Sequence, residues 1–221
     1  MILHYMNLDS GNLDDRQDYL EHTRYLDFNR KIVDDTTRRL LKSILPADHR
    51  KKAVRLFYFV RDEIPYDLIE TLFTRRDLKA STVLKRRKGF CVQKAVLLTA
   101  MARAARIPAR LHFADIRNHR TSGRALELMH TDLFVWHGYT EMNLDGQWVK
   151  VNPAFNKTLC EKKDLPTVEF DGTHDAVFAD MDLNGDPFVE YVKDHGTYAD
   201  VPYKKILNGW FEEYAEYWAL K

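Results

Sequence analysis

The amino-acid sequence predicts an α+β fold, and three observations support this prediction. Up to Pro108 the apolar residues recur with the period of amphipathic helices, and after Pro108 they alternate as in strands. A nearly continuous apolar run from Val92 to Ala105 indicates a helix that is buried on all sides. The dipeptide Asp145-Gly146, between two strand-like segments, is typical of a tight β-hairpin turn. We therefore expect N-terminal helices followed by antiparallel strands.

Two helices are predicted in the first third of the chain. The first runs from about Asn29 to the residue before Pro46, with apolar residues at helical spacing. The second follows directly, because Asp48 can cap it, and it closes at Ile64-Pro65. The charged stretch 67–79 then forms a loop of no clear pattern.

The buried helix begins with a cysteine. A short helical turn over 81–86, capped by Ser81, leads to Gly89, and a turn at this glycine delivers Cys91 onto the first turn of the helix. The helix stops before Ile107-Pro108, because a residue that precedes proline is disfavoured in the helical conformation.

The predicted strands follow this helix. Residues 111–116 alternate as in a strand, and 117–130 form a polar loop. A hairpin then joins 136–144 to 147–152 through a two-residue type I′ turn. This hairpin is the best-defined β structure that the sequence predicts.

One large domain is expected. We divide the chain into an N-terminal arm, 1–28, a domain over 29–202, and a C-terminal helix, 203–221, that packs on the same domain. The aromatic side of this last helix could also meet a membrane or a partner, but its glutamates argue against a membrane surface.

Composition excludes several classes of partner. With 34 basic and 33 acidic residues, the net charge of +1 gives no field that would attract nucleic acid or an anionic membrane. The two cysteines show no disulfide spacing, which suits a reducing compartment. The amino terminus has no secretion signal and no apolar stretch is long enough to span a bilayer, so a soluble, cytoplasmic protein is expected.

Cys91 is the candidate nucleophile. Unpaired N–H groups and the positive end of the helix dipole favour an anion at a helix start, and this stabilises a thiolate there. Lys88 and Lys94 add positive charge nearby. A lone cysteine can equally be a small buried hydrophobic residue, so its partners decide between the two interpretations.

His137 and Asn152 are the candidate partners. With a two-residue turn, Tyr139 lies opposite Asn152, and His137 shares the face of both. An amide oxygen that accepts from one imidazole nitrogen would aim the other nitrogen at a thiol. The opposite face of the hairpin is apolar, and if that face packs on the cysteine helix, His137 points away from Cys91. The pattern alone leaves this orientation open.

Other motifs are weaker. Asp180–Asp186 is similar to the first half of a calcium-binding loop, but Pro187 and Tyr191 replace residues that such a loop needs, so we expect an acidic turn. No histidine spacing is typical of zinc, and no metal or cofactor is predicted. Cys160 is interpreted as a passive thiol, and the segment 170–176 suggests order without a mechanism.

Several motifs follow one another in order between residues 30 and 155. They are Lys88-Gly89-Phe90-Cys91 at the helix start, Arg106-Ile107-Pro108-Ala109-Arg110 at its end, His137-Gly138-Tyr139-Thr140-Glu141, and the run from Asp145 to Pro153. Together they resemble the transglutaminase-like superfamily, whose bacterial members look protease-like. The resemblance implies a papain-like transglutaminase core, in which the cysteine helix packs against an antiparallel sheet. It also implies a Cys-His-Asp triad with the histidine facing the thiol.

Two residues depart from the family pattern. Asn152 stands where the superfamily usually has aspartate, and a neutral amide stabilises an imidazolium less. Phe90 stands where animal transglutaminases have glutamine, so oxyanion stabilisation needs the backbone N–H of Cys91 and a second donor. Trp136 and Tyr139 are the candidates for this donor or for lining the cleft.

We expect thiol-dependent acyl transfer on an amide or ester carbonyl through a Cys91-His137-Asn152 triad and an acyl-enzyme. Hydrolysis of a peptide or amide is favoured, because no dedicated amine channel is indicated. Transamidation to an amine is the first alternative. A catalytically weak scaffold that acts as a binding module is the second, and the oligomeric state is left open.

Overall fold

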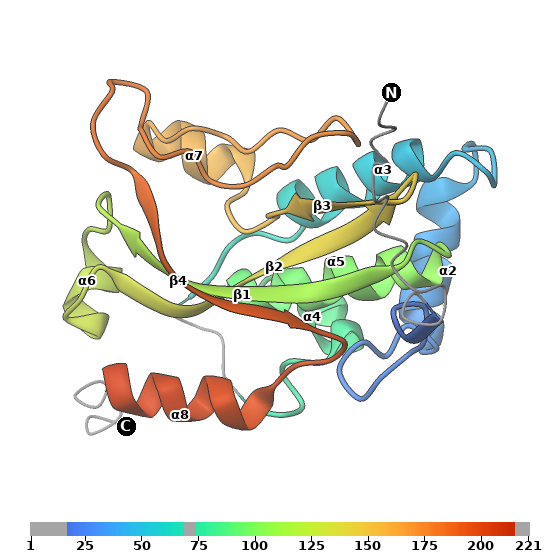
Figure 1. The fold of residues 1–221 in the computed structure, drawn as a ribbon, viewed down its shortest axis with the longest axis horizontal. Helices are drawn as coiled ribbons and strands as arrows, with labels where there is room; N and C mark the ends of the chain where they lie inside the picture. Colours follow the sequence, from blue (N-terminus) through green and yellow to red (C-terminus); the bar gives the residue numbers. More distant parts are fainter. Residues whose placement is uncertain (1–16, 69–73, 215–221) are drawn as a thin grey trace, which may run out of the picture.

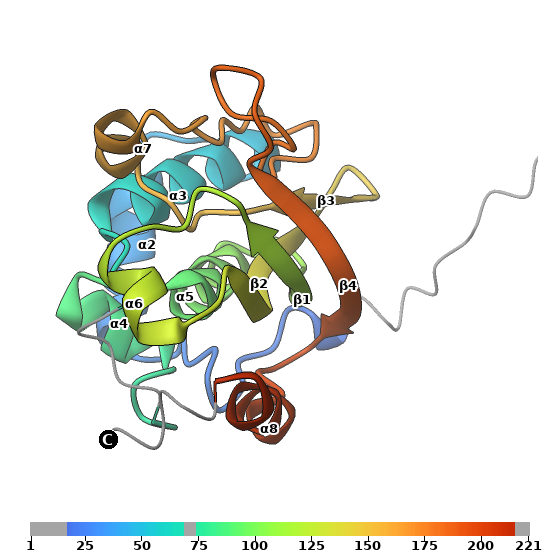
Figure 2. The same ribbon diagram turned by 90° about the vertical axis from the view of Figure 1, so that its left-hand side faces the viewer.

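The computed structural model describes residues 17–68 and 74–214. Its strands form one antiparallel sheet in the order β3-β2-β1-β4. Helices α2 to α5 gather on one side of this sheet, whereas α8 lies apart from them (Figures 1 and 2). The elements are α2 Lys31–Leu41, α3 His49–Glu63, α4 Ala80–Arg86, α5 Cys91–Ala104, β1 Ala109–Asn118, α6 Arg124–Met129, β2 Leu133–Leu144, β3 Gln147–Val151, α7 Lys157–Lys163, β4 Val189–Tyr198 and α8 Tyr203–Glu213.

The predicted N-terminal helices are confirmed, with one wrong cap. The Asp48 side chain accepts from the backbone N–H of Lys51, at 3.0 Å, as expected of the residue that caps α3. Ser81 does not cap α4, since the helix begins one residue earlier, at Ala80. The Ser81 hydroxyl instead donates to the buried carboxylate of Asp27, at 2.7 Å. This bond ties the segment that precedes α2 to helix α4.

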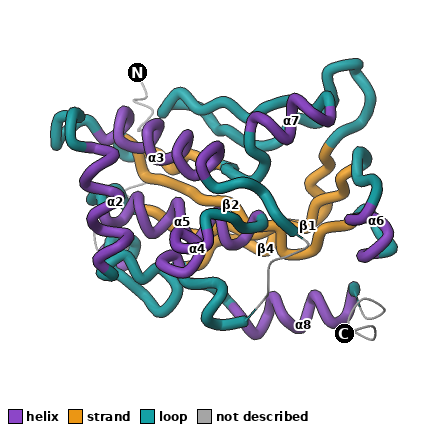
Figure 3. The backbone as a smooth tube through the Cα atoms, turned by 180° about the vertical axis from the view of Figure 1, so that it is seen from behind, coloured by secondary structure: helices purple, strands orange, loops and turns teal. Residues whose placement is uncertain are grey.

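Helix α5 is the centre of the core, as its apolar composition predicts. Its residues from Cys91 to Arg103 are all buried, between the sheet and α2, α3 and α4 (Figure 3). The Thr99 hydroxyl bonds to that of Thr140 on β2, at 3.0 Å. The buried Arg103 guanidinium donates to three backbone carbonyls outside the helix, those of Ala109, Glu21 and Ala199. The buried polar side chains of Thr99 and Arg103 are therefore satisfied by internal partners.

The hairpin has the register that the sequence predicts. Leu144 pairs with Gln147, and the pairing runs without irregularity to Thr140 and Val151. Asp145 and Gly146 have φ of 52° and 88°, the left-handed conformations that a type I′ turn requires.

Three elements were not predicted. The expected polar loop 117–130 contains α6, and α7 and β4 occupy regions without a clear periodicity of apolar residues. Strand β4 is an edge strand whose side chains are mostly exposed or half-buried, so the alternation that marks a strand is weak. It pairs with β1, and two register irregularities interrupt the pairing.

The described parts of both ends pack on the body. Leu26 is fully buried, and the Tyr19 carbonyl accepts from the N–H of Ala109 at the start of β1. The Trp210 indole of α8 donates to the Val135 carbonyl, and the hydroxyl of Tyr214, the residue after α8, donates to that of Leu133. The rest of the predicted arm, 1–16, and of the C-terminal helix, 215–221, lies outside the described residues. Within residues 17–68 and 74–214, every helix is too short or too polar to cross a bilayer.

Candidate active site

Cys91 is the first residue of α5, and the turn before it is held by a neighbouring segment. Gly89 forms a parallel bridge with Tyr66, in which the Gly89 N–H donates to the Pro65 carbonyl and the Asp67 N–H donates to the Gly89 carbonyl. A Cβ on residue 89 would lie 3.0 Å from the side chain of Gln93, so any other residue would require that side chain to shift. The sulfur thus starts the helix at a fixed place, and only 6% of the residue is exposed.

The thiol of Cys91 is neutral at physiological pH. Burial raises its pKa to about 11, although the backbone N–H groups of Gly138, Val92 and Cys91 itself act in the opposite direction. Stabilisation of a thiolate at the helix start is therefore present but weaker than desolvation. The expected help from lysines is absent, because Lys94 donates to the Arg61 carbonyl and Lys88 pairs with Asp67.

The two faces of β2 have different neighbours. A Cβ on Gly138 would lie 3.1 Å from the Cα of Val92, and Thr140 bonds to α5, so these residues face the cysteine helix. His137 and Tyr139 belong to the other face by alternation. A bulge precedes His137, where Trp136 has a φ of 58° and its N–H donates to the Asp115 carboxylate at 2.8 Å.

The thiol and the imidazole meet β2 at adjacent residues. The Cys91 sulfur lies near the backbone N–H of Gly138. The preceding residue of β2, His137, contacts Asn152 and Phe178. Within the described residues no hydrogen bond joins Cys91 to His137. The histidine orientation that the family resemblance implies therefore remains a prediction.

Asn152 contacts His137 in the reverse sense to the one expected. Its Nδ2 lies 3.2 Å from Nε2 of His137, and an amide nitrogen can only donate. Its Oδ1 already accepts from the backbone N–H of Ala154, at 3.0 Å, and a flipped amide would turn its NH₂ toward that donor. The prediction that the amide oxygen accepts from the imidazole is thus wrong, because the turn after Pro153 occupies this oxygen.

The imidazole of His137 is consequently neutral. Burial lowers its pKa to about 3, and its ring lies among Tyr139, Phe178 and Asn152 without a carboxylate partner among the described residues. Because Nε2 accepts from Asn152, the ring proton resides on Nδ1. The resting site is a thiol beside a neutral imidazole rather than an ion pair.

The segment 170–176, which had no mechanism at the level of sequence, holds Asn152 in place. The Asn152 N–H donates to the Ala176 carbonyl, and the Ala176 N–H donates to that of Lys150, both at 2.8 Å. Asp175 in turn accepts from the N–H of Lys150. The segment thereby forms a parallel bridge with Val151, the last residue of β3, just before Asn152.

Trp136 and Tyr139 stack on other histidines. The Trp136 indole lies on the ring of His195, with centroids 4.0 Å apart, and Tyr139 lies on His112 at 4.6 Å. The N–H of Gly138, which faces the Cys91 sulfur, is a better placed candidate for the second oxyanion donor. Sequence reasoning missed it because a backbone donor leaves no residue-type signal.

The remaining candidates take structural places. In the acidic turn, Asp182 accepts from the N–H groups of Asn184 and Asp186 and pairs with Arg120 at 3.1 Å. The described residues contain no group of three histidine, cysteine or acidic side chains arranged for a metal ion. Cys160 is a buried free thiol in α7.

Comparison with known proteins identifies the fold family. The family model of the transglutaminase-like superfamily matches residues 35–153, which contain Cys91, His137 and Asn152. The chain belongs to the transglutaminase-like superfamily. The resemblance that the motifs carry is thereby confirmed, as is the α+β fold with the cysteine helix on an antiparallel sheet.

Two solved structures are similar to this superfamily member. A candidate cysteine protease from Cytophaga hutchinsonii superposes with a TM-score of 0.52 at 19% identity, over 88% of this chain and 49% of the other. A candidate protease from Parabacteroides distasonis gives a TM-score of 0.38 at 15% identity, over 58% and 25%. The chain therefore spans about half the length of the first structure. No curated protein matches.

Proposed function

We propose that this chain is a cysteine-dependent acyl-transfer enzyme that hydrolyses an amide bond of a peptide, with Cys91 as nucleophile and His137 as base. The observation that carries the proposal is the convergence of three distant segments. The Cys91 sulfur at the start of α5 meets the backbone N–H of Gly138 on β2, and the preceding residue, His137, contacts Asn152 just after β3, which supports a site built from these three residues. Superfamily membership and a fold neighbour described as a candidate cysteine protease support it.

The proposed reaction has two halves. Cys91 Sγ attacks the carbonyl carbon while its proton passes to His137, and the oxyanion is stabilised by the N–H groups of Cys91 and Gly138. The C–N bond breaks as His137 protonates the leaving amine, which leaves a thioester. Water then attacks the thioester, gives a proton to His137, and releases the acid and the thiol.

The resting site has to rearrange before it reacts. The nitrogen of His137 that does not face Asn152 is Nδ1, and it carries the ring proton while Nε2 accepts from the amide. To take the proton of Cys91 through Nδ1, the imidazole must place its own proton on Nε2, and the Asn152 amide must rotate to accept it. This rotation breaks the bond from Ala154 to Oδ1, so we expect slow turnover.

Water is the acyl acceptor that we favour. A transamidase must admit an amine to the thioester and keep water away from it. With Cys91 6% exposed, the substrate itself has to open or cover the site. Adding a primary amine to the assay separates the reactions, because a transamidase converts the thioester into a new amide.

A binding scaffold is the second candidate. The reversed Asn152 contact specifically favours it, since an amide that donates to Nε2 opposes the imidazolium that catalysis needs. In this case the fold and the three side chains are present, but acylation of Cys91 does not occur.

Hydrolysis of a peptide library by the purified protein tests the proposal. We expect the wild type to cleave peptides and Cys91→Ala to show no measurable cleavage. Cys160→Ala, which removes the other buried thiol, should cleave at the wild-type rate. Mass spectrometry after trapping with iodoacetamide should place the label on Cys91. Labelling that follows Cys160, or cleavage that survives Cys91→Ala, contradicts the proposal.

A further inference from the structure

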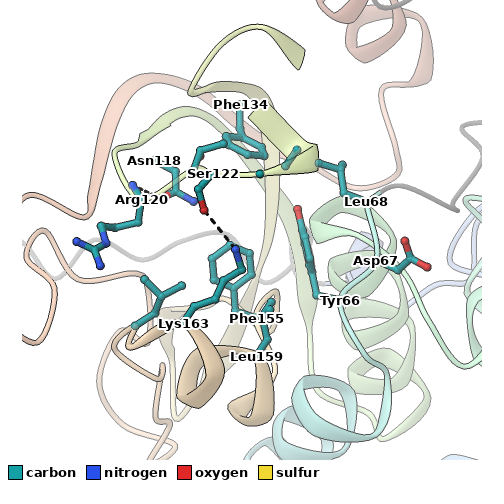
Figure 4. A pocket seen from close by; sticks show the side chains of 14 residues that line it. Tyr66, Asp67, Leu68, Asn118, Arg120, Ser122, Phe134, Phe155, Leu159 and Lys163 are labelled. Atoms are coloured by element: carbon teal, nitrogen blue, oxygen red, sulfur yellow. Dashed lines mark hydrogen bonds between the residues drawn. The ribbon is translucent and has the colours of Figure 1, made fainter. Parts of the chain in front are cut away.

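A cavity of about 340 Å³ opens beside the candidate active site. Figure 4 shows its walls, with the ring of Tyr66 facing Phe134 across the opening and the side chains of Phe155 and Leu159 below. Leu68 and Leu165 complete an apolar lining. A dry apolar cavity of about 150 Å³ already holds a benzene ring, so this one has room for an aromatic side chain and part of its backbone.

Two aromatic walls come from segments that carry candidate catalytic residues, and the third is bridged to the segment that carries Cys91. Tyr66 bridges to Gly89, two residues before Cys91. Phe134 precedes His137 by three residues on β2, and Phe155 follows Asn152 by three residues. Each wall of the cavity is therefore fixed by the same short stretch of backbone that fixes one member of the site.

Ring contacts connect the cavity to the site directly. Phe155 packs edge-on against Tyr66, at 4.9 Å, and also contacts Phe178, at 4.8 Å. Phe178 in turn contacts the imidazole of His137, at 5.5 Å. On the other side, burial and then the nearby Cys91 raise the pKa of the Tyr66 hydroxyl. Tyr66 thus connects the cavity to the thiol, and Phe155 and Phe178 connect it to the imidazole.

The rim of the cavity carries cations. The ammonium of Lys163 reaches only the hydroxyl of Ser122, at 3.5 Å, and it has no carboxylate partner among the described residues (Figure 4). Arg120 also lies at the rim, where it pairs with Asp182. The acidic Asp67 is already paired with Lys88. A basic side chain that enters the cavity would therefore meet like charge and an apolar lining.

From this geometry we infer that the cavity binds a large apolar side chain, aromatic above all, of the peptide whose carbonyl Cys91 attacks, and that it rejects lysine and arginine. The inference rests on the proposed function, since it names the substrate class of the same site. The side chain would bury its surface between Tyr66, Phe134 and Phe155, and so place the adjacent carbonyl near the start of α5.

Binding to the inactive Cys91→Ala protein tests the inference without turnover. By isothermal titration, N-acetyl-phenylalaninamide should bind about tenfold or more tightly than N-acetyl-alaninamide, and N-acetyl-argininamide should bind no better than the alanine compound. Ala125 of α6 also lines the cavity, so Ala125→Trp in the same background should fill it and remove the preference for phenylalanine. The matched control is Ala47→Trp, at an exposed position of the loop between α2 and α3, which should leave the preference intact.

Equal affinity for the three amides overturns the inference, and so does a preference that survives Ala125→Trp. Turnover by the wild type distinguishes this failure from that of the proposed function. Cysteine-dependent cleavage without preference for large apolar side chains leaves the function standing and removes the inference. A preference in binding with no cleavage of any peptide supports the cavity and contradicts the hydrolase.

Discussion

His112 and His137 lie on neighbouring strands and on the same face of the sheet, with Tyr139 between them. Both are buried, 5% and 3% exposed respectively. Nδ1 of His112 lies 2.6 Å from the Glu141 carboxylate and its Nε2 lies 2.7 Å from that of Asp194. His137 has only the amide of Asn152.

The pKa values of the two imidazoles are shifted in opposite directions. Burial lowers the pKa of each, but at His112 the hydrogen bonds to Glu141 and Asp194 outweigh burial and raise the pKa. At His137 nothing opposes burial, and the pKa falls to about 3. The polar partner, rather than depth in the protein, therefore decides whether a buried histidine of this sheet is charged. At residue 152 His137 meets an amide, where His112 meets carboxylates.

The largest effect is expected from Asn152→Asp, which gives His137 the kind of partner that His112 has. One carboxylate oxygen keeps the bond from Ala154, and the other accepts from Nε2, so the pKa of His137 should rise above its ordinary value, as that of His112 does. The nearby imidazolium then lowers the pKa of Cys91. Alkylation by iodoacetamide at pH 7 should accelerate by about 10- to 100-fold, and any hydrolysis should accelerate with it.

Asn152→Ala is the control for this change, because it removes the amide donor without adding an acceptor. It should leave the pH profile of alkylation near that of the wild type, with a rate that keeps rising toward the raised pKa of Cys91. A faster reaction at pH 7 in Asn152→Ala than in Asn152→Asp would show that the amide acts by blocking the site, not by lacking charge.

The same two histidines show how far sequence takes the interpretation. The hairpin register followed from the Asp145-Gly146 turn, because turn length alone sets which residues pair. From this register the contact of His137 with Asn152 was predictable. Its direction was not, because the orientation of the amide depends on the N–H of Ala154, a backbone group whose position no residue type reveals.

Two other features of the site could not be predicted from the sequence, the burial of Cys91 and the position of an edge strand. Cys91 was correctly placed at a helix start, but its pKa depends on how completely other segments cover it, which a local pattern does not contain. Strand β4 carries Asp194, one of the two partners of His112, and its exposed edge position left too weak an alternation to predict. The histidine whose pKa is raised could therefore not be found from the sequence.

Glu141→Gln should have the next largest effect, at the His112 end of the comparison. Glu141 is 4% exposed and accepts from both His112 and Arg110, at 2.6 and 2.7 Å. The amide keeps one acceptor and turns an NH₂ toward a donor, so the free energy of unfolding should fall by about 2–3 kcal/mol. Urea denaturation at pH 7 measures this loss. A loss below that of an exposed ion pair would mean that the network contributes little.

The pH dependence of unfolding separates the two histidines by sign. The unfolded chain protonates His137 near pH 6.5 while the native protein does so only near 3, so wild-type stability falls as pH decreases through this window. Relative to His137→Asn, the wild type should lose about 1.4 kcal/mol per pH unit between pH 6 and 4. The stability of the wild type relative to His112→Asn should stay constant between pH 6 and 4. It should decrease as pH rises above 6.5, since the native pKa of His112 is raised. Parallel curves for both variants would refute opposite protonation states.

The smallest effect is expected from Asp194→Asn, which tests whether both carboxylates are needed at His112. The Asp194 side chain is 64% exposed, whereas that of Glu141 is 5% exposed, so water replaces much of what the charge of Asp194 supplies. We expect unfolding free energy to fall by about 0.5 kcal/mol, with the fall reduced further in high salt. The pKa of His112, followed by NMR, should remain above its ordinary value because Glu141 still accepts from Nδ1. If it instead drops to the range of His137, two carboxylates are required to charge a buried histidine here, and a single aspartate at residue 152 would not suffice.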